Sequence, residues 1–336
     1  MRLRLALLTA LAPFVVSACG GSGGAMHVLV YEKPVTFDGW GWIWRAAPDG
    51  SHPRKLVLGY EPSVSPDGHW IAYLHRGQQK IAPGTTTGRD SLWMIPASGG
   101  APRKLGRDER WISILDWSSD SKHLLIYDQK GLLNVDAGRG TMTLLARTSR
   151  TVGIETASFS PDGRHVAFDR SLGNSIDIFV VPSSGGSPRQ LTHDHSSFAP
   201  LWGPSAIAYC HCVGNTSGDI WLMSGDGSRQ RRLTRTNAAI FPAAWSRDGR
   251  RLLADNPATH NGKLWAVDVP SGKATALTRW IGDLFPQGVS PDGKTVYAAI
   301  GCGGLVSPFG VLETIPFAGG PPKVIVRGPC RGSWSS

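Results

Sequence analysis

The chain has 336 residues, with 35 Lys and Arg against 25 Asp and Glu, which gives a formal net charge of +10. The charge is +8 if Arg2 and Arg4 are removed with a signal peptide. It favours an anionic lipid, a wall polymer or an acidic protein as partner, unless it serves solubility alone. No nucleic-acid motif accompanies the charge, so nucleic acid is excluded as a partner.

The N-terminus has the pattern of a targeting segment. Arg2 and Arg4 form a basic start, and an apolar run of 12 residues covers 5–16. About 20 residues are needed to span a bilayer, so the run fits a cleaved secretory signal. The sequence Val-Ser-Ala-Cys at 16–19 ends the run, and a glycine-rich linker follows.

This segment resembles a bacterial lipoprotein signal, in which the cysteine becomes the lipidated first residue. The resemblance implies a signal peptide over 1–18, a lipid-anchored Cys19 with a flexible linker over 19–26, and a folded domain over 27–336. The protein is then extracytoplasmic and held on a membrane of the cell envelope by its acyl chains. The alternative is an ordinary cleaved signal peptide without lipid.

A short turn motif recurs along the rest of the chain. Ser-Pro-Asp-Gly occurs at 65–68, 160–163 and 290–293, and degenerate copies lie between them. The Ser or Gly that opens each copy falls at positions 65, 118, 160, 203, 246 and 290, in steps of 53, 42, 43, 43 and 44 residues. A repeat of about 40–45 residues is typical of a propeller blade.

Each repeat predicts four antiparallel strands. The turn motif joins an inner strand to an apolar triplet such as 71–73, because Pro, Asp and Gly suit the central positions of a tight turn. A third strand such as 178–182 follows, and a basic strand such as 188–192 closes the unit, where charge protects an open edge. Four strands make one blade, and wide Trp rings suit the wedges between blades. The fold class is therefore an all-β propeller without a second domain.

The number of blades depends on how the two ends are counted. Six complete units begin near residues 64, 117, 159, 202, 245 and 289, and a set of three strands over 28–31, 42–45 and 54–57 precedes them without an inner strand. Trp334-Ser335 resembles that missing strand, since Ser335 follows Ser290 by 45 residues. We therefore prefer a seven-bladed monomer closed by its N- and C-terminal strands, with six blades as the alternative.

The repeat resembles that of TolB-type (WD40-like, PD40) propellers. Residues 178–192 form the most similar single copy, and the resemblance covers about 27–336. It implies a binding scaffold in the cell envelope. The chain has no room for the α/β domain that precedes the propeller in TolB, or for the hydrolase domain that follows it in prolyl oligopeptidase-type peptidases. The partner of TolB itself is therefore not implied.

No catalytic motif is evident. Residues 20–24 match Gly-x-Ser-x-Gly, but a linker lacks the strand-to-helix turn that exposes a nucleophilic serine. The chain has no His-Glu-x-x-His, no P-loop and no dinucleotide-binding motif. We therefore expect a protein that is not an enzyme and holds no cofactor.

One cluster of metal-binding residue types forms an exception. His193 and His195 lie in the loop that enters the fourth complete repeat, and Cys210 and Cys212 end the second strand of that repeat. Imidazole and thiolate suit Zn²⁺ or copper, so these four residues are a candidate metal site. The alternative is exposed loop histidines beside cysteines that are oxidised or paired elsewhere.

Cysteine parity predicts a disulfide elsewhere. Five cysteines leave four when Cys19 carries lipid. Cys302 ends a second strand, and Cys330 lies in the connection that follows the outer strand of the same blade. Both positions lie on one face of a propeller, so a disulfide between them is a candidate in an oxidising compartment.

The same face carries the candidate binding residues. Connections between the second and third strands, and between successive blades, lie there, and such loops are the usual binding surface of repeat proteins. Arg and Trp are favoured anchors at interfaces, although each could equally be a solvated loop residue. The candidates are Arg110, Trp111, Glu155, Arg235, Arg279 and Trp280.

The predicted function is a non-catalytic scaffold that binds a protein or a cell-envelope polymer. One alternative is a metal- or cofactor-dependent lyase or hydrolase, since propellers host such enzymes. The other is a small-ligand sensor or an accessory subunit of an enzyme.

Overall fold

The computed structural model describes residues 16–19, 28–34, 41–77, 88–213, 217–236, 238–256, 263–278, 284–290, 292–300 and 309–329. Every regular element within these residues is a β-strand, which confirms the all-β class. In this described part of the chain, no helix is long and apolar enough to cross a membrane.

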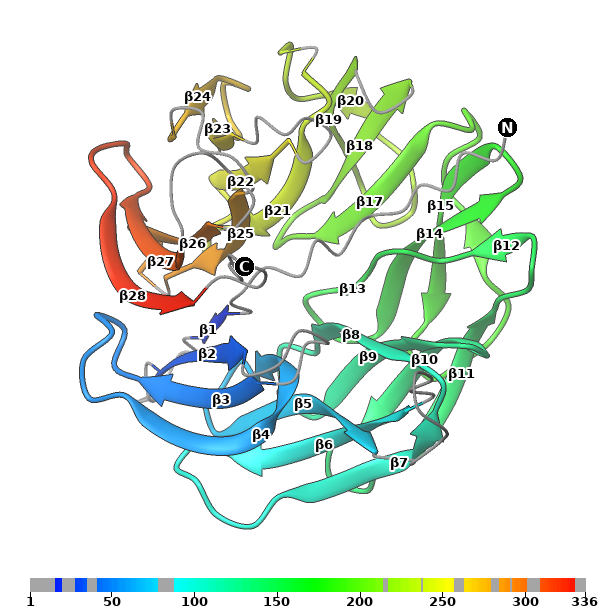
Figure 1. Cartoon of the computed structure of the whole chain (residues 1–336). Coiled ribbons are helices and arrows are strands. Elements are labelled where there is room, and N and C mark those ends of the chain that lie inside the picture. The colour runs from blue at the N-terminus through cyan, green and yellow to red at the C-terminus, as the bar shows by residue number, and fades with distance from the viewer. Residues whose placement is uncertain are drawn as a thin grey trace, which may run out of the picture.

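The strands form six antiparallel sheets around a common centre, as Figure 1 shows. Five of these sheets use strands that follow one another in the sequence, with the inner strand first. They comprise β8 (Ile112–Trp117), β9 (His123–Asp128), β10 (Gly131–Asp136) and β11 (Met142–Arg147); β12 (Val152–Gly153), β13 (Ala157–Phe159), β14 (His165–Leu172), β15 (Ser175–Pro182) and β16 (Arg189–Gln190); β17 (Ser197–Trp202), β18 (Ile207–Val213), β19 (Ser217–Met223) and β20 (Arg231–Arg232); β21 (Phe241–Trp245), β22 (Arg251–Asp255), β23 (Leu264–Asp268) and β24 (Ala274–Ala276); and β25 (Leu284–Val289), β26 (Thr295–Ile300), β27 (Phe309–Pro316) and β28 (Lys323–Pro329).

The sixth sheet has seven strands. They are β1 (Val16–Cys19), β2 (Val28–Pro34), β3 (Gly41–Ala46), β4 (Arg54–Val64), β5 (Trp70–Gly77), β6 (Arg89–Pro96) and β7 (Arg103–Glu109). Strand β4 pairs with β3 through residues 54–59 and with β5 through residues 60–64. Glu61, with a φ of 48°, lies in the bulge where β4 passes from one partner to the other.

This shared strand corrects the preferred blade count. The sequence favoured seven separate blades, whereas the strands form six sheets, which was the alternative. The physical reason is that the outer strand of one repeat continues directly as the inner strand of the next. The motif spacing locates turns, but it does not reveal whether two neighbouring repeats share a strand.

The inner edge of β2 also differs from the expectation. Strand β2 pairs with β3 on one side and with β1 on the other, in a register that runs from Val16 opposite Tyr31 to Cys19 opposite Val28. The C-terminal strand predicted for this edge, at Trp334-Ser335, lies outside the described residues. In the structure the edge is instead taken by residues 16–19, because any extended segment with free N–H and C=O groups can pair with an open strand.

The repeated turn has a physical basis in the side chains of a serine and an aspartate. Ser65 Oγ donates to Asp67 Oδ1 at 2.6 Å and accepts the N–H of Trp70 at 3.0 Å, and the same Asp oxygen accepts the N–H of His69. Gly68 has a φ of 73°, which suits glycine. The arrangement recurs after Ser118, Ser160, Ser246 and Ser290, so the sequence motif and the turn correspond.

Apolar side chains fill the space between neighbouring sheets. Leu125 of β9 packs in one cluster with Phe168 of β14 in the next sheet. Trp117 is buried, and Trp245 donates its indole N–H to Leu201 O of the preceding sheet at 3.1 Å. These tryptophans occupy the wedges between sheets, as the sequence predicted.

The basic outer strands also connect neighbouring sheets. Arg103 of β7 donates from Nη1 to Gly138 O at 2.8 Å, in the turn between β10 and β11. Arg189 of β16 donates to Asp226 O, between β19 and β20, at 3.0 Å. The arginines of the repeat therefore hold the rim together, in addition to the edge protection expected from their charge.

Candidate functional site

The antiparallel strand order places two kinds of connection at one end of the ring, here called the loop end. These are the connections between second and third strands and those between successive repeats. Arg110 and Trp111 lie there between β7 and β8, and Arg235 follows β20. Both arginines are exposed. Two further candidates, Arg279 and Trp280, lie outside the described residues.

Trp111 is an exposed aromatic side chain at this end. It is 39% exposed and packs against Tyr127 of β9, with ring centroids 4.8 Å apart and the two ring planes tilted by 58°. Beside it, Glu109 is held by Gln129 Nε2 at 2.6 Å and by Lys130 Nζ at 2.5 Å. The ring contact keeps the indole in place while leaving part of it open to a partner.

Glu155 is placed differently from the exposed arginines. It lies between β12 and β13, and its Oε2 is buried with no hydrogen-bond partner among the described residues. Burial, followed by the negative charge of Asp169, raises the pKa of Glu155 to about 7. Asp169 itself accepts from Glu155 N at 2.8 Å, Thr156 Oγ1 at 2.6 Å and Ala199 N at 3.2 Å. Asp169 therefore joins two sheets, and Glu155 is the carboxyl of the pair that lacks partners.

Other inner carboxyls were missed by the sequence analysis. Burial raises the pKa of Asp116 to about 6 and that of Asp255 to about 7. Burial, followed by the charge of Asp90, raises the pKa of Glu61 to about 7. Their one sequence signal is a carboxyl within an otherwise apolar inner or second strand.

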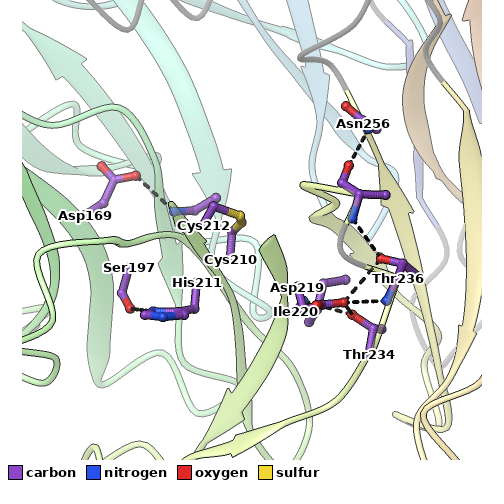
Figure 2. Close-up of a disulfide and its surroundings, with 12 residues drawn as sticks. Asp169, Ser197, Cys210, His211, Cys212, Asp219, Ile220, Thr234, Thr236 and Asn256 are labelled. Atoms are coloured by element: carbon purple, nitrogen blue, oxygen red, sulfur yellow. Dashed lines mark hydrogen bonds between the residues drawn. A yellow bond between two sulfur atoms is a disulfide. The ribbon is translucent and has the colours of Figure 1, made fainter. Parts of the chain in front are cut away.

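The cysteines of the candidate metal site are bonded to each other. Cys210 and Cys212 form a disulfide within β18, shown in Figure 2, and both are buried. Gly218, opposite Cys212, leaves room for its sulfur, because a Cβ there would collide with it. Neither sulfur is a thiolate in this form. Within the described residues, no group of three or more His, Cys, Asp and Glu side chains is arranged to hold a metal ion.

The two histidines of that site have different surroundings. His195 Nδ1 lies 2.9 Å from Asp177 Oδ2, and His195 N donates to Asp177 Oδ1 at 3.1 Å. His193 is exposed. A zinc or copper ion at these four residues stays a prediction that requires the reduced thiols. The disulfide predicted between Cys302 and Cys330 falls outside the described residues.

The bond between His195 and Asp177 has a structural counterpart in the next sheet. There Asp219 Oδ1 accepts from Thr234 Oγ1 at 2.7 Å and from Thr236 N at 2.8 Å (Figure 2). In these two sheets an aspartate near the start of the third strand thus holds the loop that leaves the outer strand. His195 occupies the position of Thr236 in this clamp, which explains its contact without a metal.

A Ser, a His and an Asp lie close together near the disulfide. Ser197 Oγ lies 3.5 Å from His211 Nδ1 (Figure 2). It also donates to Asp194 Oδ2 at 2.8 Å. The same Nδ1 lies 3.4 Å from Asp194 Oδ2. A catalytic histidine bonds the serine and the aspartate through different nitrogens. Because Ser197 is also fully buried, this group is not an activated nucleophile.

No family model matches the chain. An uncharacterized protein of Agrobacterium fabrum is 28% identical over 157 residues, which cover 46% of this chain and 54% of that protein. The Tol-Pal system protein TolB of Anaeromyxobacter dehalogenans is 26% identical over 121 residues, or 32% of this chain and 27% of that protein. The chain thus spans about half the length of the first of these curated relatives and about a quarter of the second.

Solved structures extend the likeness over most of the ring. TolB from Acinetobacter baumannii is 19% identical with a TM-score of 0.56, over 94% of this chain and 82% of that one. A structure assigned to TolB from Agrobacterium tumefaciens is 23% identical with a TM-score of 0.53, over 68% and 84%.

Two kinds of propeller enzyme align as well. Prolyl endopeptidases are 11% identical with a TM-score of 0.66, over 92% of this chain and 50% of theirs. An oligogalacturonate lyase in complex with manganese is 13% identical with a TM-score of 0.58, over 94% and 85%. At these identities the structural likeness concerns the fold alone. The chain is a β-propeller that is similar, in repeat sequence and in fold, to TolB.

Proposed function

We propose that the protein is a non-catalytic binding scaffold of the cell envelope, which binds a protein or an envelope polymer at its loop end. The observation that carries this function is the partly exposed Trp111, held by its tilted ring contact with Tyr127, beside the exposed Arg110. Trp and Arg are the residues that contribute most at protein interfaces. The similarity to TolB, a component of the Tol-Pal system, supports an envelope role.

A lipid anchor at Cys19 fits this orientation. Cys19 lies opposite Val28, where β2 begins. This position is at the end of the ring that carries the Ser-Pro-Asp-Gly turns, opposite the loop end. An anchor there directs the loop end away from the membrane, toward partners in the envelope. Labelling with radioactive palmitate tests the anchor, and a Cys19→Ser variant that is still labelled would remove it.

A catalytic function is the second candidate. Glu61 and Glu155 have pKa values of about 7, which suits general acid–base chemistry, and propeller enzymes are among the similar structures. This function predicts that replacing Glu155 by Gln abolishes turnover of a substrate. The scaffold predicts no turnover and loss of partner binding when the loop end is altered.

The experiment that tests the scaffold is capture of partners from envelope extracts by purified protein. A double variant with Trp111→Ala and Arg110→Ala should lose the captured partner. Arg139→Ala is the matched control, since this arginine is 83% exposed but lies in a turn at the opposite end. Capture that is equal with both variants would contradict binding at the loop end, and capture of nothing by the wild type would contradict the scaffold.

We also propose that residues 331–335 close the ring at β2 in the mature protein. Support comes from signal cleavage before Cys19, which would remove residues 16–18 from the edge of β2.

A further inference from the structure

Two large apolar side chains are exposed in the described part of the chain, and both lie at the loop end. Trp111 is 39% exposed, and Leu172, at the end of β14, is 62% exposed. They belong to neighbouring sheets, the first at the entry to β8 and the second at the tip of the hairpin formed by β14 and β15. Exposed apolar side chains that gather at one place mark interaction surfaces more often than scattered ones do.

Three contacts, joined by short stretches of chain, connect the two positions. Glu109, two residues before Trp111, binds Lys130 Nζ at 2.5 Å. The carbonyl of Lys130 accepts the N–H of Thr148 at 3.2 Å. Four residues later, Val152 pairs with Leu172. The loops that leave β7, β9 and β11 therefore lie side by side, and one surface leads from Trp111 to Leu172.

This surface carries an excess of positive charge. Four exposed arginines lie in or next to the connected loops, namely Arg107, Arg110, Arg147 and Arg150. The acidic neighbours are already neutralised, because Glu109 binds Lys130 and Asp108 binds Lys104. Among the ion pairs formed by the described residues, none uses any of the four guanidinium groups. These charges are therefore available to a ligand.

We infer that the four arginines, together with Trp111 and Leu172, dock an acidic protein segment that also presents an apolar side chain. These six residues are called the arginine patch. The patch consists of Arg107, Arg110, Trp111, Arg147, Arg150 and Leu172. Guanidinium groups bind carboxylates through paired hydrogen bonds, which favours Asp- and Glu-rich chains. Leu172 and the open part of Trp111 need an apolar contact, which a hydrophilic polymer does not supply and a peptide does.

The inference rests on the proposed scaffold function and makes it more specific. The candidates from the sequence also included Glu155 and Arg235. The patch instead extends over three successive sheets, since Arg107 lies in the outer strand β7, Arg147 ends the outer strand β11 and Leu172 ends β14. Glu155, with its buried oxygen, contributes to the interior and not to this surface.

The test uses a fluorescent 12-residue peptide of Glu and Ser with one central Leu, titrated against the whole purified protein. The Kd should rise with salt, as charge pairing requires. Reversing the four arginines to Glu should weaken binding by about 100-fold, and Leu172→Ser by about tenfold. Leu172→Ser should leave the binding of a Leu-free peptide unchanged. Circular dichroism and the melting temperature show whether each variant is folded.

The matched control reverses four exposed cations at the opposite end, Lys122, Arg139, Arg164 and Lys294. It changes the net charge equally and should alter the Kd less than twofold. Equal weakening by the control would overturn the patch, because the peptide would then sense only overall charge. Stronger patch-dependent binding of phosphatidylglycerol vesicles or of soluble peptidoglycan fragments would also overturn it, in favour of a lipid or a polymer.

Failure of the patch and failure of the scaffold give different results. If the charge-reversed protein still captures the envelope partner of the wild type, the scaffold stands and the patch is wrong. If the wild type captures nothing and binds no peptide, both are wrong. Binding of the peptide by the wild type and its loss in the Leu172→Ser variant would support the patch.

Discussion

The carboxylate of Asp116 in β8 accepts the backbone N–H of Phe159 in β13 at 2.8 Å. One side chain thereby joins the inner strands of neighbouring sheets. Its other oxygen accepts the N–H of Trp117, also at 2.8 Å. From the second strand β14, Asp169 also reaches the next sheet and accepts the N–H of Ala199 of β17 at 3.2 Å. The ring is therefore held near its centre by carboxylates as well as by apolar packing.

Replacing Asp116 by Ala should lower the free energy of unfolding by about 2–4 kcal/mol. Two partly buried N–H groups, of Trp117 and Phe159, would lose their acceptor, and each unsatisfied group costs about 1–3 kcal/mol. Asp116→Asn should cost less, because the amide keeps one acceptor oxygen. Urea unfolding at pH 7 measures both values. An Ala variant as stable as the wild type would show that the carboxylate does not join the sheets.

The stability of the propeller should rise as the pH falls from about 8 to about 5. Burial raises the pKa of Asp255 and Glu155 to about 7, from ordinary values of 3.8 and 4.5. A carboxyl whose pKa is higher in the folded state binds its proton more tightly there. Its contribution is complete below the unfolded pKa and is lost as the pH rises through the folded one. Melting temperatures across this range measure the effect.

Below this range the opposite effect should appear. Hydrogen bonds from Ser160 and from the N–H of Arg164 lower the pKa of Asp162, and the other turn aspartates behave alike. Their stabilisation is lost as the pH falls below about 4, so stability should be greatest near pH 5. The combined Glu155→Gln and Asp255→Asn variant should flatten the slope between pH 5 and pH 8. An unchanged slope would mean that other groups titrate there.

Arg103→Ala should destabilise the protein by about 1–2 kcal/mol, whereas Arg139→Ala should change stability by less than about 0.5 kcal/mol. Arg103 donates to the backbone carbonyls of Ala137 and Gly138 in the next sheet. Arg139 lies in that same turn but is 83% exposed, and its Nη1 lies 3.8 Å from Asp136. Equal effects of the two changes, measured by denaturant unfolding, would show that the rim contact is not stabilising.

The sequence predicted the local features of this fold and missed those that depend on contacts between repeats. The Ser-x-Asp-Gly turn forms from residues within five positions of one another, so its motif could be read directly. The continuous strand β4 could not, because its two halves pair with different partners. Nor could the disulfide of Cys210 with Cys212 be told from a thiolate pair, since residues two apart on a strand share a face in either state.

For the candidate site, too, the sequence predicted some features and missed others. Trp111 and Arg110 are exposed at the loop end, as expected from their place between repeats. Leu172 was not a candidate, because a leucine at the end of an apolar strand is expected to be a core residue. Its exposure depends on its position at the tip of the hairpin formed by β14 and β15, which the sequence does not show. Glu155 is a loop residue by sequence, yet its carboxyl is partly buried, because Asp169 draws the backbone of its loop inward.

Removing residues 330–336 should affect the melting temperature differently in two forms of the protein. In a mature chain that begins at residue 19, β1 has lost residues 16–18, and the buried residues Val28, Val30 and Tyr31 need another strand beside them. If residues 331–335 supply it, the deletion should lower the melting temperature by about 5 °C or more. In a chain that keeps residues 1–18, where β1 already pairs with β2, the deletion should change the melting temperature little.

Hydrogen exchange at the amides of residues 28–31 measures the same edge directly. In the mature chain these amides should be protected, and the deletion or a Trp334→Ala change should expose them. Protection that survives the deletion in the mature chain would contradict closure by the C-terminus, because the amides of residues 28–31 would then be protected without residues 330–336. Equal exposure of these amides in the mature chain with and without residues 330–336 would mean that the ring stays open at β2 after the signal is removed. In that case the edge would be a free template for pairing with a second molecule, and the melting temperature would depend on protein concentration.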